Sequence, residues 1–150
     1  ALAFAGAGRP GGALSMAKKS FRVTMSERCF RFKPDALGNH APPIPSVYEF
    51  VTFNEARQPE VLFVGVAAES LYDSLGAHMT GKAKPTWDEL FAAAKDVYFD
   101  YVASSDAAGP EDLGDIAAAF IAKNKPRLNS GPAPSSGRWS EVEVVEAEQP

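Results

Sequence analysis

SVYEFVTFNEARQPEVLFVGVAAESLYDSLGAHMTG, residues 46–81, is the stretch of sequence that decides the fold. Its first eight residues are rich in aromatic and β-branched side chains, which predicts a strand. NEARQP then breaks that strand, and EVLFVGV is a short apolar run typical of a second strand. Leu71, Leu75 and Met79 recur at every fourth position, which indicates a helix. The stretch therefore predicts a β-hairpin followed by a helix, around which the rest of the chain is organised.

The chain after this stretch predicts two more helices and one more strand. Thr86 and Glu89 are spaced as a capping box, which marks the start of a helix. Residues 96–102 alternate between two faces as a strand does. Pro110 suits the first turn of a last helix, which is expected to end near Asn124. The expected fold class is α+β: a small central three-stranded, mostly antiparallel sheet flanked by helices, with an N-terminal strand extension and a flexible C-terminal tail.

Composition divides the 150 residues into three segments. Residues 1–45 form a basic N-terminal extension and linker with net charge +5, residues 46–129 form the domain with net charge −6, and residues 130–150 form an acidic tail rich in Pro, Gly and Ser with net charge −3. The acidic domain is a poor electrostatic match to a nucleic-acid backbone. If nucleic acid binds, the basic extension is the better candidate.

The sequence also supports expectations about the cellular location of the protein and about processing of its N-terminus. There is no apolar run of about 18 residues, so no membrane span is expected. The single cysteine, Cys29, excludes an internal disulfide and fits a reducing compartment, with the cytoplasm favoured over an organelle. Residues 1–15 have three interpretations: a transit-peptide remnant, a genuine flexible arm, or an upstream addition before a natural start at Met16, which is slightly favoured.

Residues 18–35 alternate between aromatic or aliphatic and basic side chains, which predicts one or two strands and a hairpin around Ser26 and Glu27. One interpretation is a nucleic-acid surface. The other, which is favoured, is a half-buried strand whose phenylalanines pack on the core. The basic side chains that would carry the first interpretation are Lys18, Lys19, Arg22, Arg28, Arg31 and Lys33.

Two further segments are expected to lack regular structure. Residues 36–45 hold three prolines and are expected to be a linker, with His40 in solvent. Residues 139–145 are expected to be flexible, and to form a strand only where a partner offers a sheet edge.

Four motifs, in this order, resemble those of the GIY-YIG endonuclease domain over residues 46–129. Residues 47–48 stand where the Ile-Tyr of its first motif belongs, and residues 63–65 stand where its Tyr-Ile-Gly belongs. Residues 70–81 resemble its N-L-x-x-R-L-x-x-H-x-x-G stretch, and residues 121–129 resemble its closing K-P-x-x-N. The resemblance implies a scaffold built for metal-assisted phosphodiester hydrolysis, in which a tyrosine, an arginine and a metal-holding glutamate act together.

The sequence departs from this pattern at the residues that the reaction needs. The second-motif tyrosine is Phe63, the arginine position is Ser74, and the glutamate position is Ala117. Phenylalanine has no hydroxyl, serine carries no positive charge for the phosphate, and alanine offers no oxygen to a hard divalent cation. The remnant site therefore lacks three chemically distinct roles.

Other residues of the pattern remain and have structural interpretations. Gly65 permits close packing, Tyr48 buries its ring, and His78 and Asn129 find local hydrogen-bond partners. Lys125 also remains. These interpretations are favoured over retained catalysis.

The sequence thus predicts a non-catalytic GIY-YIG-like binding module, an accessory or scaffold subunit of a larger protein complex whose partners are other protein subunits. One alternative is a nucleic-acid-binding protein that uses the basic N-terminal arm. The other is a divergent metal-dependent endonuclease. No cofactor and no metal site are expected, and Mg²⁺ would be needed only if the nuclease alternative holds.

Overall fold

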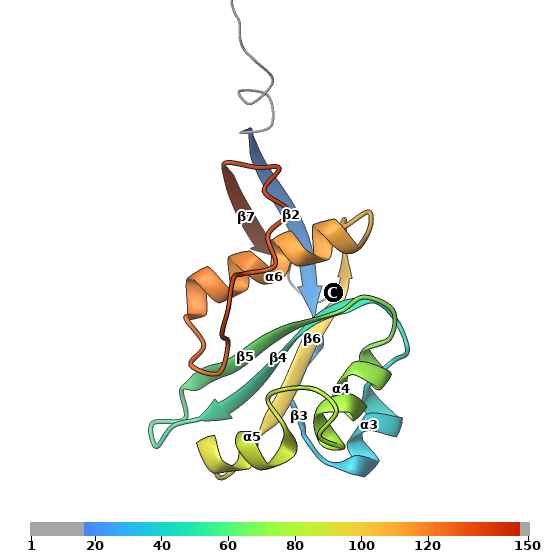
Figure 1. Ribbon diagram of the computed structural model, residues 1–150, viewed down its shortest axis with the longest axis vertical. Coiled ribbons are helices and arrows are strands. Elements are labelled where there is room, and N and C mark those ends of the chain that lie inside the picture. Colours follow the sequence, from blue (N-terminus) through green and yellow to red (C-terminus); the bar gives the residue numbers. More distant parts are fainter. Residues whose placement is uncertain (1–16, 148–150) are drawn as a thin grey trace, which may run out of the picture.

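A six-stranded mixed sheet with helices on both faces forms the core of the molecule (Figure 1). The computed structural model describes residues 17–147, so the expectations for residues 1–15 lie outside the described residues. Neighbouring strands in the sheet follow the order β5-β4-β6-β2-β7. The short strand β3 also pairs with β6 but is not part of this order. The strands are β2 (Lys18–Met25), β3 (Phe30–Arg31), β4 (Ser46–Phe53), β5 (Pro59–Ala67), β6 (Tyr98–Ser105) and β7 (Glu141–Glu146). The helices are α3 (Pro34–His40), α4 (Leu71–Met79), α5 (Trp87–Ala93) and α6 (Pro110–Asn124).

The predicted hairpin and the helix that follows it are confirmed. β4 and β5 pair antiparallel, with Tyr48 opposite Gly65 and Phe50 opposite Phe63. β6 adds antiparallel to the other side of β4. The α+β class is also confirmed, and no helix within residues 17–147 is long and apolar enough to cross a bilayer.

Each face of the sheet has its own buried cluster. One cluster joins β4 and β5 to α3, α4 and α5 through side chains such as Phe50, Leu75 and Leu90. The other joins the opposite face to α6 through side chains such as Val64 and Ile116. The alternation of side chains along β4 and β5 separates the two clusters, because successive residues point to opposite faces. Figure 1 shows α6 alone across one face and the three shorter helices on the other.

The sheet has six strands, so the predicted three-stranded sheet is not confirmed. The predicted hairpin around Ser26 and Glu27 is wrong. β2 and β3 do not pair with each other, because each pairs antiparallel with a different part of β6. Val23 lies opposite Ser105, whereas Phe30 lies opposite Phe99. The eight residues of β6 are enough to pair with the last three residues of β2 and with both residues of β3, so residues 26–29 connect two strands of one sheet.

The prediction of a flexible C-terminal tail is also wrong. β7 lies parallel to β2 and pairs with it from Lys18 opposite Glu141 to Val23 opposite Glu146. Val142 and Val144 pack against the α6 cluster, so the alternating pattern of this segment buries one face. The sheet edge that the sequence analysis required from a partner comes from the chain's own β2.

A buried ionic contact holds the segment between α6 and β7 in place. Asp115 is only 1 % exposed and accepts hydrogen bonds from the backbone N–H and the hydroxyl of Ser136. Arg138 donates to Asp115 at 2.8 Å and to Asp112 at 2.7 Å. These contacts hold the irregular segment that precedes β7 against α6.

The segment expected to be a linker contains most of a short helix. α3 begins at Pro34, where the missing N–H is harmless, and ends at His40 before the prolines. His40 is not a solvated loop residue, because its ring stacks on that of Phe30 with centroids 4.2 Å apart.

The capping box at the start of α5 is confirmed and yields a stability prediction. The Thr86 hydroxyl accepts from the N–H of Glu89 at 3.2 Å, and the Glu89 carboxylate accepts from the N–H of Thr86 at 2.9 Å. We expect Thr86→Ala to lower the free energy of unfolding by about 1 kcal/mol, measured by urea denaturation. Thr80→Ala, at the end of α4, is the control and is expected to cost less than about 0.5 kcal/mol. Equal losses in the two variants would contradict the capping role.

Candidate functional site

Tyr48 and His78, two retained residues of the nuclease-like pattern, are joined by a buried hydrogen bond. The Tyr48 hydroxyl lies 2.7 Å from His78 Nε2, and His78 Nδ1 lies 2.9 Å from the carbonyl oxygen of Pro85. A carbonyl only accepts, so Nδ1 carries the proton and Nε2 accepts from the Tyr48 hydroxyl. Both ring nitrogens of a neutral histidine are thereby occupied, and the pair keeps only the acceptor capacity of the buried Tyr48 hydroxyl oxygen.

Burial opposes ionisation of both side chains. It raises the pKa of Tyr48 above its usual range. It also lowers the pKa of His78, although the hydrogen bond to Pro85 acts in the other direction. A neutral phenol bonded to a neutral imidazole at physiological pH is a poor source of a nucleophile or of a positive charge.

Aromatic side chains fill the space around this pair. The Phe63 ring lies 5.4 Å from the His78 ring, and the Phe50 ring lies 5.0 Å from it, both measured between centroids. The Tyr48 ring lies directly over Gly65, where any Cβ would overlap with it. The remnant site on this face is therefore packed as a core.

The remaining positions of the nuclease-like pattern lie elsewhere. Ala117 is fully buried in the α6 cluster, on the opposite face of the sheet from Tyr48. Ser74 lies in the middle of α4 and is half-buried. Asn129 braces the outer edge of β5, since its side chain accepts from the N–H of Val64 and donates to the Val64 carbonyl, each at 2.9 Å. The structure thus brings Tyr48, Phe63, Gly65 and His78 together, places Asn129 beside the strand that carries Phe63 and Gly65, and leaves Ala117 on the opposite face.

The six basic residues of the N-terminal arm do not gather into one surface. Lys18, Lys19 and Arg22 lie on β2, while the other three lie at or beside β3, toward the opposite end of the molecule (Figure 1). Several have partners within the chain: Lys18 pairs with Glu141, Arg31 with Asp96, Lys33 with Asp35, and the Arg28 guanidinium lies over the Phe30 ring. These exposed pairs are weak individually, yet they reduce the positive field along the arm.

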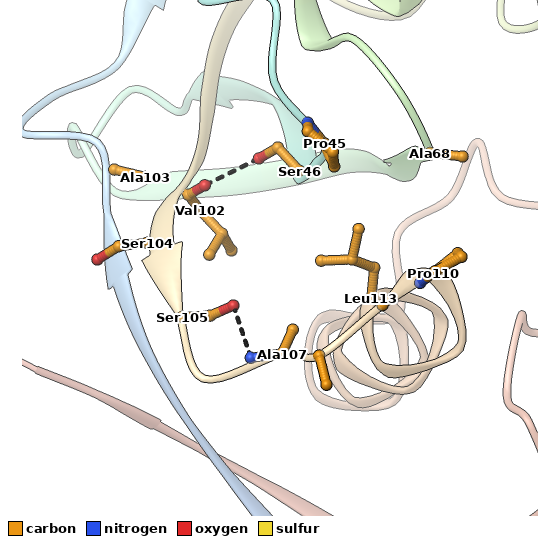
Figure 2. A pocket seen from close by; sticks show the side chains of 12 residues that line it. Pro45, Ser46, Ala68, Val102, Ala103, Ser104, Ser105, Ala107, Pro110 and Leu113 are labelled. Atoms are coloured by element: carbon orange, nitrogen blue, oxygen red, sulfur yellow. Dashed lines mark hydrogen bonds between the residues drawn. The ribbon is translucent and has the colours of Figure 1, made fainter.

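A cavity of about 340 Å³ lies where β6 ends and α6 begins. Figure 2 shows that its lining includes prolines, alanines and serines, with Val102 and Leu113 facing the interior. Ser46 donates its hydroxyl to the Val102 carbonyl, and the Ser105 hydroxyl accepts from the N–H of Ala107 (Figure 2). None of the lining residues, all of which are described, ionises at neutral pH, so this cavity offers shape without acid–base chemistry.

A second cavity, of about 290 Å³, holds the acidic groups that the sequence analysis did not single out. Glu49 on β4 lies opposite Asp100 on β6, and the Cys29 thiol donates to Asp100 Oδ2 at 3.7 Å. Burial first, and then the adjacent Asp100, raise the pKa of Glu49 to about 9. Burial also raises the pKa of Asp100, and burial together with Asp100 raises that of Cys29 to about 12.

The chemistry of this cavity follows from those shifts. A hydrogen bond between two carboxyl groups needs a proton, so Glu49 and Asp100 share one at neutral pH. The high pKa of Cys29 makes it a hydrogen-bond donor rather than a nucleophile. Within residues 17–147, no group of three or more His, Cys, Asp or Glu side chains is arranged to hold a metal ion. In the sequence, the signal for this acidic cavity was one acidic residue within each of two largely apolar strands, Glu49 in β4 and Asp100 in β6.

This chain matches no known family model, no curated protein and no solved structure. The resemblance to the GIY-YIG domain therefore stays a prediction, and the geometry of the described residues carries the functional argument.

Proposed function

We propose that the chain is a non-catalytic GIY-YIG-like binding module, an accessory or scaffold subunit of a larger protein assembly, which takes a strand of its partner onto the open edge of β7. The observation that carries the proposal is the position of β7 at the end of the sheet, with no further strand beside it among the described residues. An exposed sheet edge offers unpaired backbone N–H and carbonyl groups, which an extended segment of another protein can bind.

The other edge of the sheet is less available. β5 ends the sheet on that side, but the N–H of Leu128 donates to the Leu62 carbonyl and Asn129 bonds both backbone groups of Val64. The exit from α6 thus covers the middle of this edge. β7 is the better docking edge.

Side-chain charge on β7 selects the kind of partner. Glu141 and Glu143 are exposed, Glu146 ends the strand, and Val145 is 38 % exposed. A second copy of β7 would set glutamates beside glutamates, which is unfavourable across a strand pair. A partner strand that alternates basic and β-branched residues would place cations beside these carboxylates and apolar groups beside Val145. The expected partner is therefore a basic strand of a different protein.

The packed remnant site supports a role without catalysis. Tyr48 and His78 satisfy each other, Phe63 lies against them, and Ala117 is on the opposite face of the sheet. The arrangement offers neither a charge for a phosphate nor an oxygen for a metal ion at the positions where the nuclease reaction needs them.

A titration of the full chain with an alternating valine–lysine hexapeptide, followed by isothermal calorimetry, tests the docking edge. We expect Glu143→Lys to weaken binding about tenfold or more, because it reverses a charge on β7. Glu55→Lys makes the same change in the exposed turn between β4 and β5 and is expected to leave binding unchanged. Purification from the native source with the same two variants then asks whether a stoichiometric partner is lost only with Glu143→Lys.

Three results would contradict the proposal. Equal binding of the peptide by both variants would exclude β7 as the edge. Salt-sensitive nucleic-acid binding that disappears when Lys18, Lys19, Arg22, Arg28, Arg31 and Lys33 are neutralised would favour the basic arm instead. Cleavage of DNA or RNA that depends on Mg²⁺ or Mn²⁺ and is abolished by Tyr48→Phe would favour a divergent endonuclease.

A further inference from the structure

The cavity that contains Glu49 and Asp100 lies on the α6 side of the sheet, apart from the backbone edge of β7 that the proposed function uses. Its apolar wall consists mainly of side chains from β4, β5 and α6. Its polar lining consists of the two carboxyls, Cys29, Lys123, Asn124 and Glu146. The apolar lining residues include Val51, Phe53, Val61 and Phe120. A volume of about 290 Å³ with a mixed lining suits a small organic molecule with one polar end.

Glu49 is a buried carboxyl whose hydrogen-bond partner among the described residues is the carboxyl of Asp100. Its side chain lines the cavity, yet the residue is only 8 % exposed. Lys123 and Glu146 also line the cavity, and they act on Glu49 only through their charge. Asp100 is in a similar position, because its Oδ1 is buried and no described donor reaches it. With one shared proton the pair keeps one buried negative charge, and no cation of the described residues forms an ion pair with it, which is costly.

The charged groups around the pair leave the cavity negative. Glu146 at the end of β7 and Lys123 near the end of α6 line it as well, and the Cys29 thiol is neutral. Lys123 makes no ion pair with Glu49 or Asp100 in the described part of the chain, although its charge is felt at Glu49. With one proton shared by the pair, Glu146 and Lys123 cancel and one negative charge remains uncompensated.

We propose that this cavity binds a small organic cation, an ammonium group carried on an apolar body, with Glu49 and Asp100 as its counter-ions. The ammonium group supplies the missing positive charge and donates to the carboxyl oxygens that line the cavity, while the pair keeps its shared proton. The apolar body lies against Phe53 and Phe120, whose rings favour both apolar contact and a nearby cation. The apolar lining favours such a molecule over a hydrated inorganic ion.

Calorimetric titration of the full chain with 2-phenylethylamine tests this site, and 2-phenylethanol, which lacks the charge, is the matched ligand. At pH 7 we expect the alcohol to bind about tenfold or more weakly than the amine. Glu49→Gln is expected to lower the affinity for the amine by a similar factor. Glu55→Gln, an exposed acid in the β4–β5 turn, is expected to leave it unchanged. The pair keeps its shared proton on binding, so the apparent enthalpy is expected to be the same in buffers of different ionisation enthalpy.

The proposal is overturned if the wild-type chain binds no amine, if the alcohol binds as well as the amine, or if Glu49→Gln binds as the wild type does. Binding of Mg²⁺ in place of the amine also overturns it. Should Glu49→Gln fail to fold, amide chemical shifts of the wild-type chain decide the matter. The amine must then perturb Val51, Phe53 and Lys123, and perturbation confined to other residues places the ligand elsewhere. None of these outcomes depends on the partner strand at β7.

Discussion

Gly65→Ala is expected to lower the free energy of unfolding by about 2–3 kcal/mol, because the added methyl group enters a fully packed site. A Cβ at this position would overlap with Tyr48 Cζ and would lie 2.9 Å from Phe63 Cε2. The Tyr48 ring cannot easily move aside, since its hydroxyl is bonded to His78 and the residue is only 4 % exposed. Urea denaturation followed by tryptophan fluorescence measures the loss.

The control for this variant is Gly76→Ala in α4. A Cβ at Gly76 meets nothing within 4 Å, and the residue lies inside a helix. The same chemical change is therefore expected to stabilise the protein by about 0.5–1 kcal/mol. A loss below about 1 kcal/mol for Gly65→Ala would show that Tyr48 adapts, which contradicts a rigidly packed remnant site.

The hairpin and the helices α4, α5 and α6 could be predicted because their signals are local, whereas α3 was expected to be part of a linker. The aromatic and β-branched residues of β4, the break before β5 and the capping box at Thr86 are each contained within a few residues. The last helix was also predicted to end near Asn124, and α6 does end there. Each of these elements is specified by its own stretch of chain, so the sequence alone was sufficient.

The rest of the sheet depends on contacts between distant segments. β2 and β7 pair although more than a hundred residues separate them in the sequence. The sequence of neither strand indicates which strand it pairs with. The pattern of Val142 and Val144 was visible, but the face it packs against is made by Phe21 and α6. Likewise, Asp115 and Arg138 meet only because the exit from α6 turns back along the helix. Tertiary pairing overrode the expectation drawn from composition alone.

The two candidate sites also differ in how much of each could be predicted from the sequence. Tyr48 and His78 were singled out by motif, and their contact follows from the way α4 packs on β4. Glu49 and Asp100 were passed over because each is one acid in an apolar strand, a pattern that alone indicates an edge or a bulge. Their importance appears only when the register of β4 and β6 sets them opposite each other.

Between pH 7 and pH 9 the wild-type protein is expected to lose about 2 kcal/mol of its free energy of unfolding through Glu49. The pKa of this carboxyl is raised to about 9 in the folded protein, chiefly by burial, whereas in the unfolded chain it stays near 4.5. Above pH 4.5 the folded state thus holds a proton that the unfolded state has released. The stabilising contribution is complete below pH 4.5 and declines as the pH rises toward 9. Urea denaturation at a series of pH values measures the slope.

Glu49→Gln is expected to flatten that slope, because glutamine does not ionise and its amide can donate to Asp100. The variant therefore becomes more stable than the wild type at pH 9, although a buried group has been changed. His78 does not confuse the measurement, since its lowered pKa gives a slope of the opposite sign that lies below pH 6.5. The other titrating groups around Glu49, namely Asp100, Glu146, Lys123 and Cys29, are present in both proteins. Glu55→Gln is expected to keep the wild-type slope, and equal slopes in wild type and Glu49→Gln would mean that Glu49 is ionised in the folded protein.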